Sequence, residues 1–300
     1  MISFDDFDAW GEAVSGASLS LACDAVETPL WTLGILDLGG TVLQVASEGG
    51  GNLCHGANTH TGPILFVPLT HASEHVVNGV PLDDDTLLSI PRGADFSICV
   101  RRRAHAWCSI AVPDGVHIGH DAAPGSARLA CRPGSVQALR RLVNEIAAAL
   151  LDQPAGTAAH RTAGIDLLDM AVSCLSETPR LRPATGRPRL DRAAIVRRAM
   201  EAIDAAPTLP TAVDIARQIG VNGRTLLRTF RETFGVGPKQ YLMLRQLHLI
   251  RRILKAEAPE HATVADVLAR RGIWEFGRFA GRYRRHFGEL PSETLARARA

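Results

Sequence analysis

Two stretches near the C-terminus carry arginines at spacings that suit one helix face. Arg224 and Arg228 stand four residues apart, and Arg282, Arg284 and Arg285 form a second group. Side chains at positions i and i+4 project from the same side of a helix. A guanidinium can donate two parallel hydrogen bonds to a guanine edge or to a phosphate. These residues therefore indicate binding to nucleic acid.

The two groups lie in two copies of one sequence pattern. The copies begin at Val213 and Val264 and read VDIARQIGVNGRTLLRTFRETFGVGPKQYL and VADVLARRGIWEFGRFAGRYRRHFGELPSETL. Gly220 and Gly272 stand at the same point of the copies, where we expect a turn that a side chain would oppose. Each copy predicts a short helix, a glycine turn and a longer Arg-rich helix. This is the pattern of a helix-turn-helix that places its second helix in the DNA major groove.

The apolar residues of each second helix predict which side chains remain exposed. In the first unit we expect Asn222 to cap the helix, because Asn favours the N-cap. The predicted buried stripes are Leu226, Phe230 and Phe234 in the first unit and Phe279, Tyr283 and Phe287 in the second. Among the residues left exposed, Arg224 and Arg228 suit guanine and Leu227 suits only a thymine methyl, while Arg231 suits phosphate. In the second unit, Gly277 and Gly281 would let the backbone approach DNA, with Arg282, Arg284 and Arg285 on phosphates.

Charge is divided unevenly along the chain. The net charge is only +2, yet residues 191–300 hold 20 basic and 11 acidic groups, a net of +9. Residues 1–190 hold 13 basic and 20 acidic groups, a net of −7. A basic region joined to an acidic one indicates a nucleic-acid-binding half and a half that does not bind DNA.

Residues 19–113 are rich in short apolar stretches bounded by turn residues. TLGILDL, TVLQVA, PILFVPL, TLLSIP and DFSICV are examples, and Asn78-Gly79 is a strong hairpin signal. Many short strands with such punctuation predict an antiparallel sandwich or barrel. We expect an all-β barrel over residues 1–134, and the interior of a barrel is a natural small-molecule pocket.

The first residues to consider for such a pocket are polar or aromatic, namely Trp31, His55, His60, Trp107, His71 and His75. His71 and His75 would share one side of a helix, but their context predicts strand and loop, where this spacing is not a metal site. No third and fourth ligand follows at a recognisable spacing, so we expect neither a metal nor another cofactor. The six cysteines are scattered without a C-x-x-C pair, which favours buried free thiols.

Three segments follow the predicted barrel. Residues 135–178 carry apolar residues at 3-4-3-4 spacing, with the second stripe at Ile165, Leu168, Val172 and Leu175, and predict a helical hairpin. The hairpin packs on its own domain or forms a subunit interface, and the spacing leaves both open. Residues 179–190, which contain three prolines, predict a linker. Residues 191–300 then form the helical domain, which Asp191 is expected to cap.

The C-terminal pattern resembles the DNA-binding domain of AraC/XylS-family transcriptional regulators, over about residues 191–300. The shared motifs are I-A-x-x-x-G, R-T-L-x-R-x-F, G-x-x-P-x-x-Y-L and G-x-W-x-x-G-R-F-A-x-x-Y-R-R-x-F-G-E-x-P-S-E-T-L. The resemblance implies seven helices, with two helix-turn-helix units bridged by a long helix over about residues 238–255. VNGVPLDDDTLLSIPRGADFSI and HAWCSIAVP resemble the family's cupin-like sensing domain. The chain departs from the family pattern at Leu268 and Ile273, both expected in the core.

The resemblance also implies which residues meet DNA and what the protein does. By position, the family's base-reading residues fall on Arg224, Thr225, Leu227 and Arg228 in the first unit and on Phe276, Gly277, Ala280 and Gly281 in the second. The expected protein is a transcriptional regulator, not an enzyme, that binds double-stranded DNA and responds to a small effector in the barrel. We expect an activator that contacts RNA polymerase and acts as a homodimer.

Two other interpretations stay open on the sequence. In the first, a regulator is switched by a partner protein and the barrel is empty; in the second, a metal-cupin enzyme carries a DNA-binding tail. A polar, accessible interior would argue against the first, and a bound metal would favour the second. The N-terminus lacks a signal-peptide pattern and no apolar run reaches the ~20 residues of a membrane span, so a cytoplasmic protein without membrane contact is expected.

Overall fold

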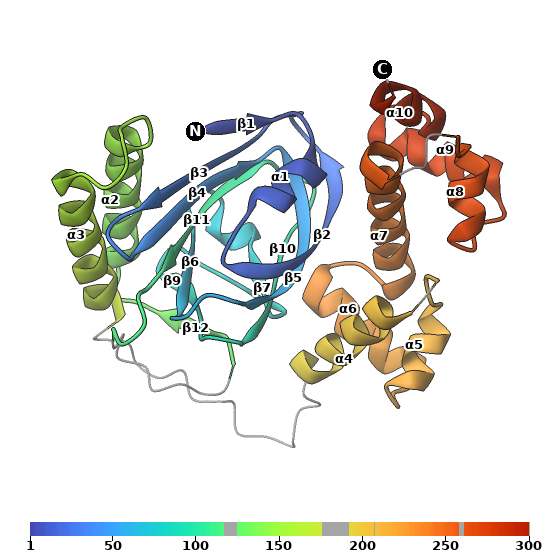
Figure 1. Ribbon diagram of the computed structural model, residues 1–300. Helices are drawn as coiled ribbons and strands as arrows, with labels where there is room; N and C mark the ends of the chain where they lie inside the picture. The colour runs from blue at the N-terminus through green and yellow to red at the C-terminus, as the bar shows by residue number, and fades with distance from the viewer. Residues whose placement is uncertain (117–124, 176–191, 207, 258–260, 300) are drawn as a thin grey trace. The chain divides into compact units, whose positions relative to one another are not determined.

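A computed structural model describes residues 1–116, 125–175, 192–206, 208–257 and 261–299. The chain divides into two compact units, Met1–Ala193 and Ala194–Ala300 (Figure 1). The predicted linker at 179–190 and the predicted cap at Asp191 lie outside the described residues.

The first unit is built on two antiparallel sheets. In chain order its first elements are β1 (Ile2–Phe4), α1 (Phe7–Ala13), β2 (Ala17–Val26), β3 (Trp31–Asp37), β4 (Val42–Glu48), β5 (Gly50–Asn58), β6 (Ile64–Pro68) and a 3₁₀ turn η1 (Ala72–Glu74). There follow β7 (Val76–Val77), β8 (Val80–Pro81), β9 (Thr86–Ile90), β10 (Asp95–Val100), β11 (His105–Ala111) and β12 (Ala127–Ala130). The larger sheet has the order β1-β3-β4-β11-β6-β9-β12, and the smaller has the order β2-β5-β10-β7-β8.

The first unit is β-rich as predicted, but its described strands do not form a closed barrel. Within the described residues each strand pairs only inside its own sheet, so the two sheets enclose a core without closing into one cylinder. That core is aromatic at one end, where α1 adds Phe7 and Trp10 to Trp31 and Trp107. Short apolar strands with turn signals are shared by sandwiches and barrels, and the sequence pattern does not distinguish the two.

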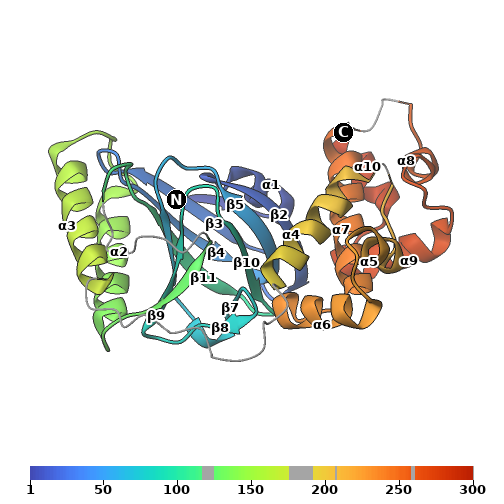
Figure 2. The ribbon, with the colours of Figure 1, turned by 90° about the horizontal axis from the view of Figure 1, so that it is seen from below.

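The outer face of the larger sheet is covered by a helical hairpin, α2 (Ser135–Leu150) and α3 (Ala158–Leu175) (Figure 2). The sheet is therefore buried on both faces, which explains why β6 and β9 are apolar runs with every residue buried. The stripe of α2 packs here, on its own domain, which is one of the two alternatives that the spacing left open. In the predicted stripe of α3, Leu168, Val172 and Leu175 pack on or in this core, but Ile165 is 61% exposed and Leu167 is fully buried in its place. Gly164 sets the phase, since a Cβ there would lie 2.1 Å from the carbonyl oxygen of Leu38.

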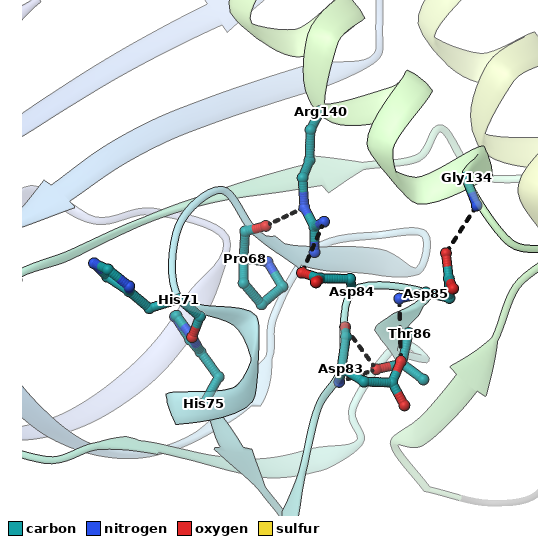
Figure 3. Close-up of polar contacts among 9 residues, drawn as sticks. All are labelled: Pro68, His71, His75, Asp83, Asp84, Asp85, Thr86, Gly134 and Arg140. Atoms are coloured by element: carbon teal, nitrogen blue, oxygen red, sulfur yellow. Dashed lines mark hydrogen bonds and ion pairs between the residues drawn. The ribbon is translucent and has the colours of Figure 1, made fainter.

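Polar contacts hold α2 to the loops between strands (Figure 3). Arg140 donates from Nε to the carbonyl oxygen of Pro68, at 2.7 Å, and its Nη1 lies 3.5 Å from Asp84. The amide of Gly134, at the helix start, donates to Asp85 at 2.9 Å. These contacts attach the hairpin to the ends of β6 and β9.

The second unit is helical. Its elements are α4 (Arg192–Ala205), α5 (Ala212–Gln218), α6 (Gly223–Phe234), α7 (Pro238–Arg252), a π-helical turn η2 (Ile253–Glu257), α8 (Val264–Arg270), α9 (Phe276–Phe287) and α10 (Pro291–Ala298). These include the seven helices that the resemblance implies, and α7 with η2 spans the region of the expected bridging helix. Leu268 and Ile273 are buried in the second half of this unit, as expected.

Candidate functional site

Both helix-turn-helix units begin with the same cap. Thr211 caps α5 and Thr263 caps α8, each in a reciprocal capping box with the acid three residues later. Hydrogen bonds from the threonine hydroxyl and backbone lower the pKa of Asp214 and of Asp266 below the ordinary aspartate value. The two copies of the sequence pattern are thus two copies of one local structure.

A glycine then turns the chain toward the second helix of each unit. Gly220 has a φ of +71° and Gly272 a φ of +73°, both in the left-handed region that favours glycine. Asn222 follows in the first unit, and its side-chain oxygen accepts from the amide of Thr225 at 2.8 Å. The predicted cap is therefore confirmed.

Aromatic residues fix the first of these second helices, α6. Leu226, Phe230 and Phe234 are fully buried, and Tyr241 of α7 packs on both phenyl rings at centroid distances of 5.5 and 4.7 Å. A helix held along one face by this stripe must present its other face outward. The predicted buried stripe of α6 is confirmed.

The outward face of α6 carries the arginines. Arg224, Arg228 and Arg231 are exposed, whereas Thr225 and Leu227 are half-buried, with Leu227 against the backbone of Gly237. Glu232 was not among the predicted site residues, although its Oε1 lies 2.9 Å from Nε of Arg228. An acid at i+4 from an arginine was the available signal. This pair leaves the two terminal nitrogens of Arg228 on a side chain that is 71% exposed.

The outward face of α9 is different in kind. Phe279 and Tyr283 are buried and Phe287 is half-buried, which leaves Gly277 exposed and Ala280 and Gly281 half-exposed. A Cβ added to Gly277 would meet nothing within 4 Å. The backbone of this helix is therefore open to a close approach near its N-terminus.

Aromatic and charged side chains surround that open backbone. Phe276 is 38% exposed and Trp274, just before the helix, is 72% exposed. Glu275 contacts Arg278 at 2.7 Å and Arg282 at 4.0 Å, while Arg284 and Arg285 are exposed. The acid Glu275 and its partner Arg278 were not among the predicted site residues.

The first unit encloses a separate cavity between its two sheets. Its volume is about 70 Å³, and its walls are mostly apolar, with Trp10, Phe66, Phe96 and Trp107 among the lining residues. A few polar side chains reach it as well, namely Ser15, Gln44, Glu48, Asn52, His105 and Ser109. A mostly apolar cavity with a few convergent polar groups is typical of a small-molecule site.

A buried ion pair lies at the polar end of this cavity. Glu48 and His105 face each other on β4 and β11, with Oε1 of Glu48 3.4 Å from Nε2 of His105. Trp107 donates from Nε1 to the same Oε1 at 2.7 Å. Burial alone would lower the pKa of His105, but the charge and hydrogen bond of Glu48 raise it above the ordinary value.

A second buried histidine packs edge-on against His105. The ring of His75 lies 5.0 Å from that of His105, and its Nδ1 lies 3.0 Å from the carbonyl oxygen of His71. Burial, with the neighbouring His105, lowers the pKa of His75 to about 3. His75 is therefore neutral, and it packs against His105, which favours its protonated form.

Of the six residues considered for the pocket, one lines this cavity, and His71 and His75 are not among its lining residues. Trp107 does so, whereas Trp31, His55 and His60 are not among its lining residues. Side chains alternate along a strand, so the inward Asn52 and Cys54 of β5 leave His55 directed to the opposite face. Trp31 packs on Phe7 at 6.2 Å, and the Nδ1 of His60 accepts from the amide of Gly62.

Three further features of the described residues bear on the class of protein. Among the described residues, no group of three or more histidine, cysteine or acidic side chains is placed to hold a metal. No helix in the described part of the chain combines the length and the apolar character that crossing a membrane requires. All six cysteines are buried free thiols, as predicted.

Comparison with known proteins finds relatives over parts of the chain. Residues 215–297 match a family model described as a helix-turn-helix domain. A probable thc operon regulatory protein of Rhodococcus erythropolis is 31% identical over 150 residues, which cover 48% of this chain and 45% of that protein. The XylDLEGF operon transcriptional activator of Pseudomonas putida is 38% identical over 72 residues, or 24% and 22% of the two chains. The chain thus spans less than half the length of these curated relatives.

A solved structure is also similar. A probable AraC family transcriptional regulator from Rhodopseudomonas palustris CGA009 is 31% identical, and the match covers 36% of this chain and 99% of that one, with a TM-score of 0.33. The sequence motifs, the family model and the curated relatives agree that residues 215–297 are a helix-turn-helix domain of the AraC/XylS family of transcriptional regulators.

Proposed function

We propose that this protein is a transcriptional activator that binds double-stranded DNA through α6 and α9 and responds to a small effector in the cavity of its first unit. The observation that carries the proposal is the repeated geometry of the second unit. Two capped helices, each followed by a glycine turn, present two arginine-bearing helices whose opposite faces are buried. A helix so presented suits the major groove.

We assign base reading in the first unit mainly to Arg224 and Arg228. Both extend from the first two turns of α6, the part of a recognition helix that reaches base edges. Thr225 and Leu227 complete the proposed set, with Leu227 limited to an apolar contact, and Arg231 is assigned to phosphate. The ion pair of Arg228 with Glu232 supports a bidentate role, because it fixes Nε and leaves both terminal nitrogens to donate.

We assign a weaker base-reading role to α9. Phe276, Gly277, Ala280 and Gly281 offer apolar contact and close backbone approach rather than hydrogen bonds to bases. Arg282, Arg284 and Arg285 are assigned to phosphates, which position a protein on DNA without specifying sequence. This division predicts that the first unit contributes most of the sequence preference.

The first unit is proposed to be an open, cupin-like sensing module. Its cavity has buried polar groups among aromatic walls, which favours a small molecule over a protein partner as the effector. We assign a homodimer contact to the exposed side of α3, centred on Ile165, which is 61% exposed. The P. putida relative is named as an activator, and by that likeness we expect contact with RNA polymerase.

The proposal is tested with a random DNA pool and the purified full-length protein. Bound DNA is selected and sequenced, and the affinity of the selected sequence is then titrated with salt. We expect a recurring motif and a fall in affinity with rising salt, because phosphate contacts release counterions. Binding without any motif would leave only electrostatic attraction and would refute sequence reading by α6.

A further inference from the structure

Two buried acceptor atoms at the cavity have no partner among the described residues. Glu48 is 4% exposed and Asn52 is 6% exposed, and both line the cavity. Oε2 of Glu48 and Oδ1 of Asn52 receive no hydrogen bond. A buried acceptor without a donor is costly, and such groups in folded proteins are nearly always satisfied. These two atoms therefore call for a donor that the described chain does not supply.

The two acceptors come from opposite walls. Glu48 ends β4 of the larger sheet, and Asn52 lies in β5 of the smaller sheet. The three glycines between them, Gly49, Gly50 and Gly51, carry the chain from one sheet to the other. A molecule in the cavity can thus be held from both sides at its polar end.

The other polar groups whose bonds are known at this cavity already satisfy one another. Gln44 donates to the carbonyl oxygen of Ser15 at 2.9 Å and to Oγ of Ser109 at 3.2 Å, and its own oxygen accepts from the amide of Ser15. Oε1 of Glu48 accepts from Trp107. Oε2 of Glu48 and Oδ1 of Asn52 therefore lack hydrogen-bond donors, whereas the rest of the cavity wall is aromatic and aliphatic.

We infer that the cavity binds a small, mostly apolar molecule through a hydrogen-bond donor, a hydroxyl or an ammonium group, that Glu48 and Asn52 accept. This inference deepens the effector role proposed above and rests on it. A carboxylate is the wrong head group, because it would place a second negative charge and further acceptors beside Glu48. The aromatic walls accept the apolar body and, for an ammonium ligand, add cation–π attraction.

The size of the cavity limits the ligand. At about 70 Å³ it has roughly half the volume of an engineered ~150 Å³ apolar cavity that takes up benzene. A series of four-carbon compounds therefore suits the test: butan-1-ol, butylammonium, 1-chlorobutane and butyrate. Each carries an unbranched alkyl chain, propyl in butyrate and butyl in the other three, and they differ in whether the head group donates, is neutral or is charged. The methylene that butyrate lacks accounts for about 0.8 kcal/mol, or roughly fourfold in affinity, which is less than the difference expected below.

Binding of the four probes to the full-length protein is measured by saturation-transfer NMR and by tryptophan fluorescence, since Trp10 and Trp107 line the cavity. We expect butan-1-ol or butylammonium to bind about tenfold more tightly than 1-chlorobutane and butyrate. Preference for the alcohol identifies a neutral donor, and preference for the amine identifies a cation. Equal binding of all four, tightest binding of butyrate, or binding of none overturns the inference.

Variants place the discrimination at the two acceptors. Glu48→Gln replaces an acceptor with a donor and should reduce or reverse the preference over butyrate, and Asn52→Leu should weaken the preference over 1-chlorobutane. Cys108→Ala is the matched control, because this buried residue adjoins Trp107 but faces the helical hairpin. It should retain the preference. If Glu48→Gln does not fold, the Asn52→Leu variant and the binding of the four probes to the wild-type protein still test the inference.

Sequence-specific DNA binding by the same preparation separates this inference from the proposed function. A recurring DNA motif without any head-group preference refutes the ligand inference and leaves the DNA-binding proposal intact. Head-group preference without a DNA motif supports the ligand class and refutes the DNA-reading proposal.

Discussion

Arg228→Ala should separate DNA recognition from stability more cleanly than any other single change in the second unit. The side chain is 71% exposed, and its ion pair with Glu232 is an exposed i, i+4 pair. Such pairs contribute about 0.3–0.5 kcal/mol. The loss of the pair should therefore leave the unfolding temperature nearly unchanged.

The effect on specific binding should be much larger. A bidentate arginine–guanine contact discriminates by about 1–3 kcal/mol, which corresponds to roughly a 5- to 150-fold loss of affinity. Affinity for the selected motif and for a scrambled sequence is measured by fluorescence anisotropy at several salt concentrations. We expect the loss on the motif to exceed the loss on the scrambled sequence.

The matched control is Arg197→Ala in α4. Arg197 is 51% exposed and also contacts an acid at i+4, Glu201, at 3.8 Å, but it lies outside both helix-turn-helix units. The control should cost little on either DNA. If Arg228→Ala weakens both sequences equally, or if the control weakens the motif as much, then base reading by Arg228 is refuted.

Four further outcomes are expected. Gly220→Ala should destabilise the protein by about 1–2 kcal/mol in chemical unfolding, because the φ of Gly220 is +71°. Gly277→Ala should stabilise α9 by up to about 1 kcal/mol and yet weaken DNA binding, because a methyl group there would obstruct the approach of the backbone to DNA. Unchanged DNA affinity of Gly277→Ala would contradict this close approach. Stability should fall as pH drops below about 5, since Asp214 and Asp266 have lowered folded-state pKa values and their contribution is lost on protonation; the double Asp→Asn variant should flatten this dependence in thermal melts. Glu289→Ala should lower the melting temperature and cost about 1–3 kcal/mol, because this largely buried acid accepts from Thr294 and contacts two arginines; a melting temperature equal to that of wild type would show that the network contributes nothing.

The helical unit could be anticipated because its signals are local. The cap at Asn222, the turn at Gly220 and the stripe of Leu226, Phe230 and Phe234 all act within about a dozen residues, and the structure confirms each of them. Acids that pair with arginines, such as Glu232, were overlooked. A search for opposite charges at i+4 would have found that pair.

The cavity could not be anticipated because its residues meet only through sheet pairing. Trp107 and Glu48 are 59 positions apart, and neither the motif search nor the periodicity joins them. Side chains alternate along β5, and a shift of one residue in the pairing register exchanges its two faces. This alternation directs Cys54 toward the core and His55 away from it. In α3 the small residue Gly164 set the buried face, and a search for large apolar residues selected Ile165 instead.

One strand connects the cavity with the helical hairpin. Along β6, Phe66 lines the cavity, Val67 packs in the core beneath the hairpin, and the carbonyl oxygen of Pro68 accepts from Arg140 of α2. Close-packed interiors transmit small displacements rather than absorbing them. A ligand that moves Phe66 therefore acts on the anchor of α2 within two residues. The same hairpin carries the exposed side of α3 to which we assign the dimer contact, so we expect occupancy of the cavity to alter the geometry of that contact.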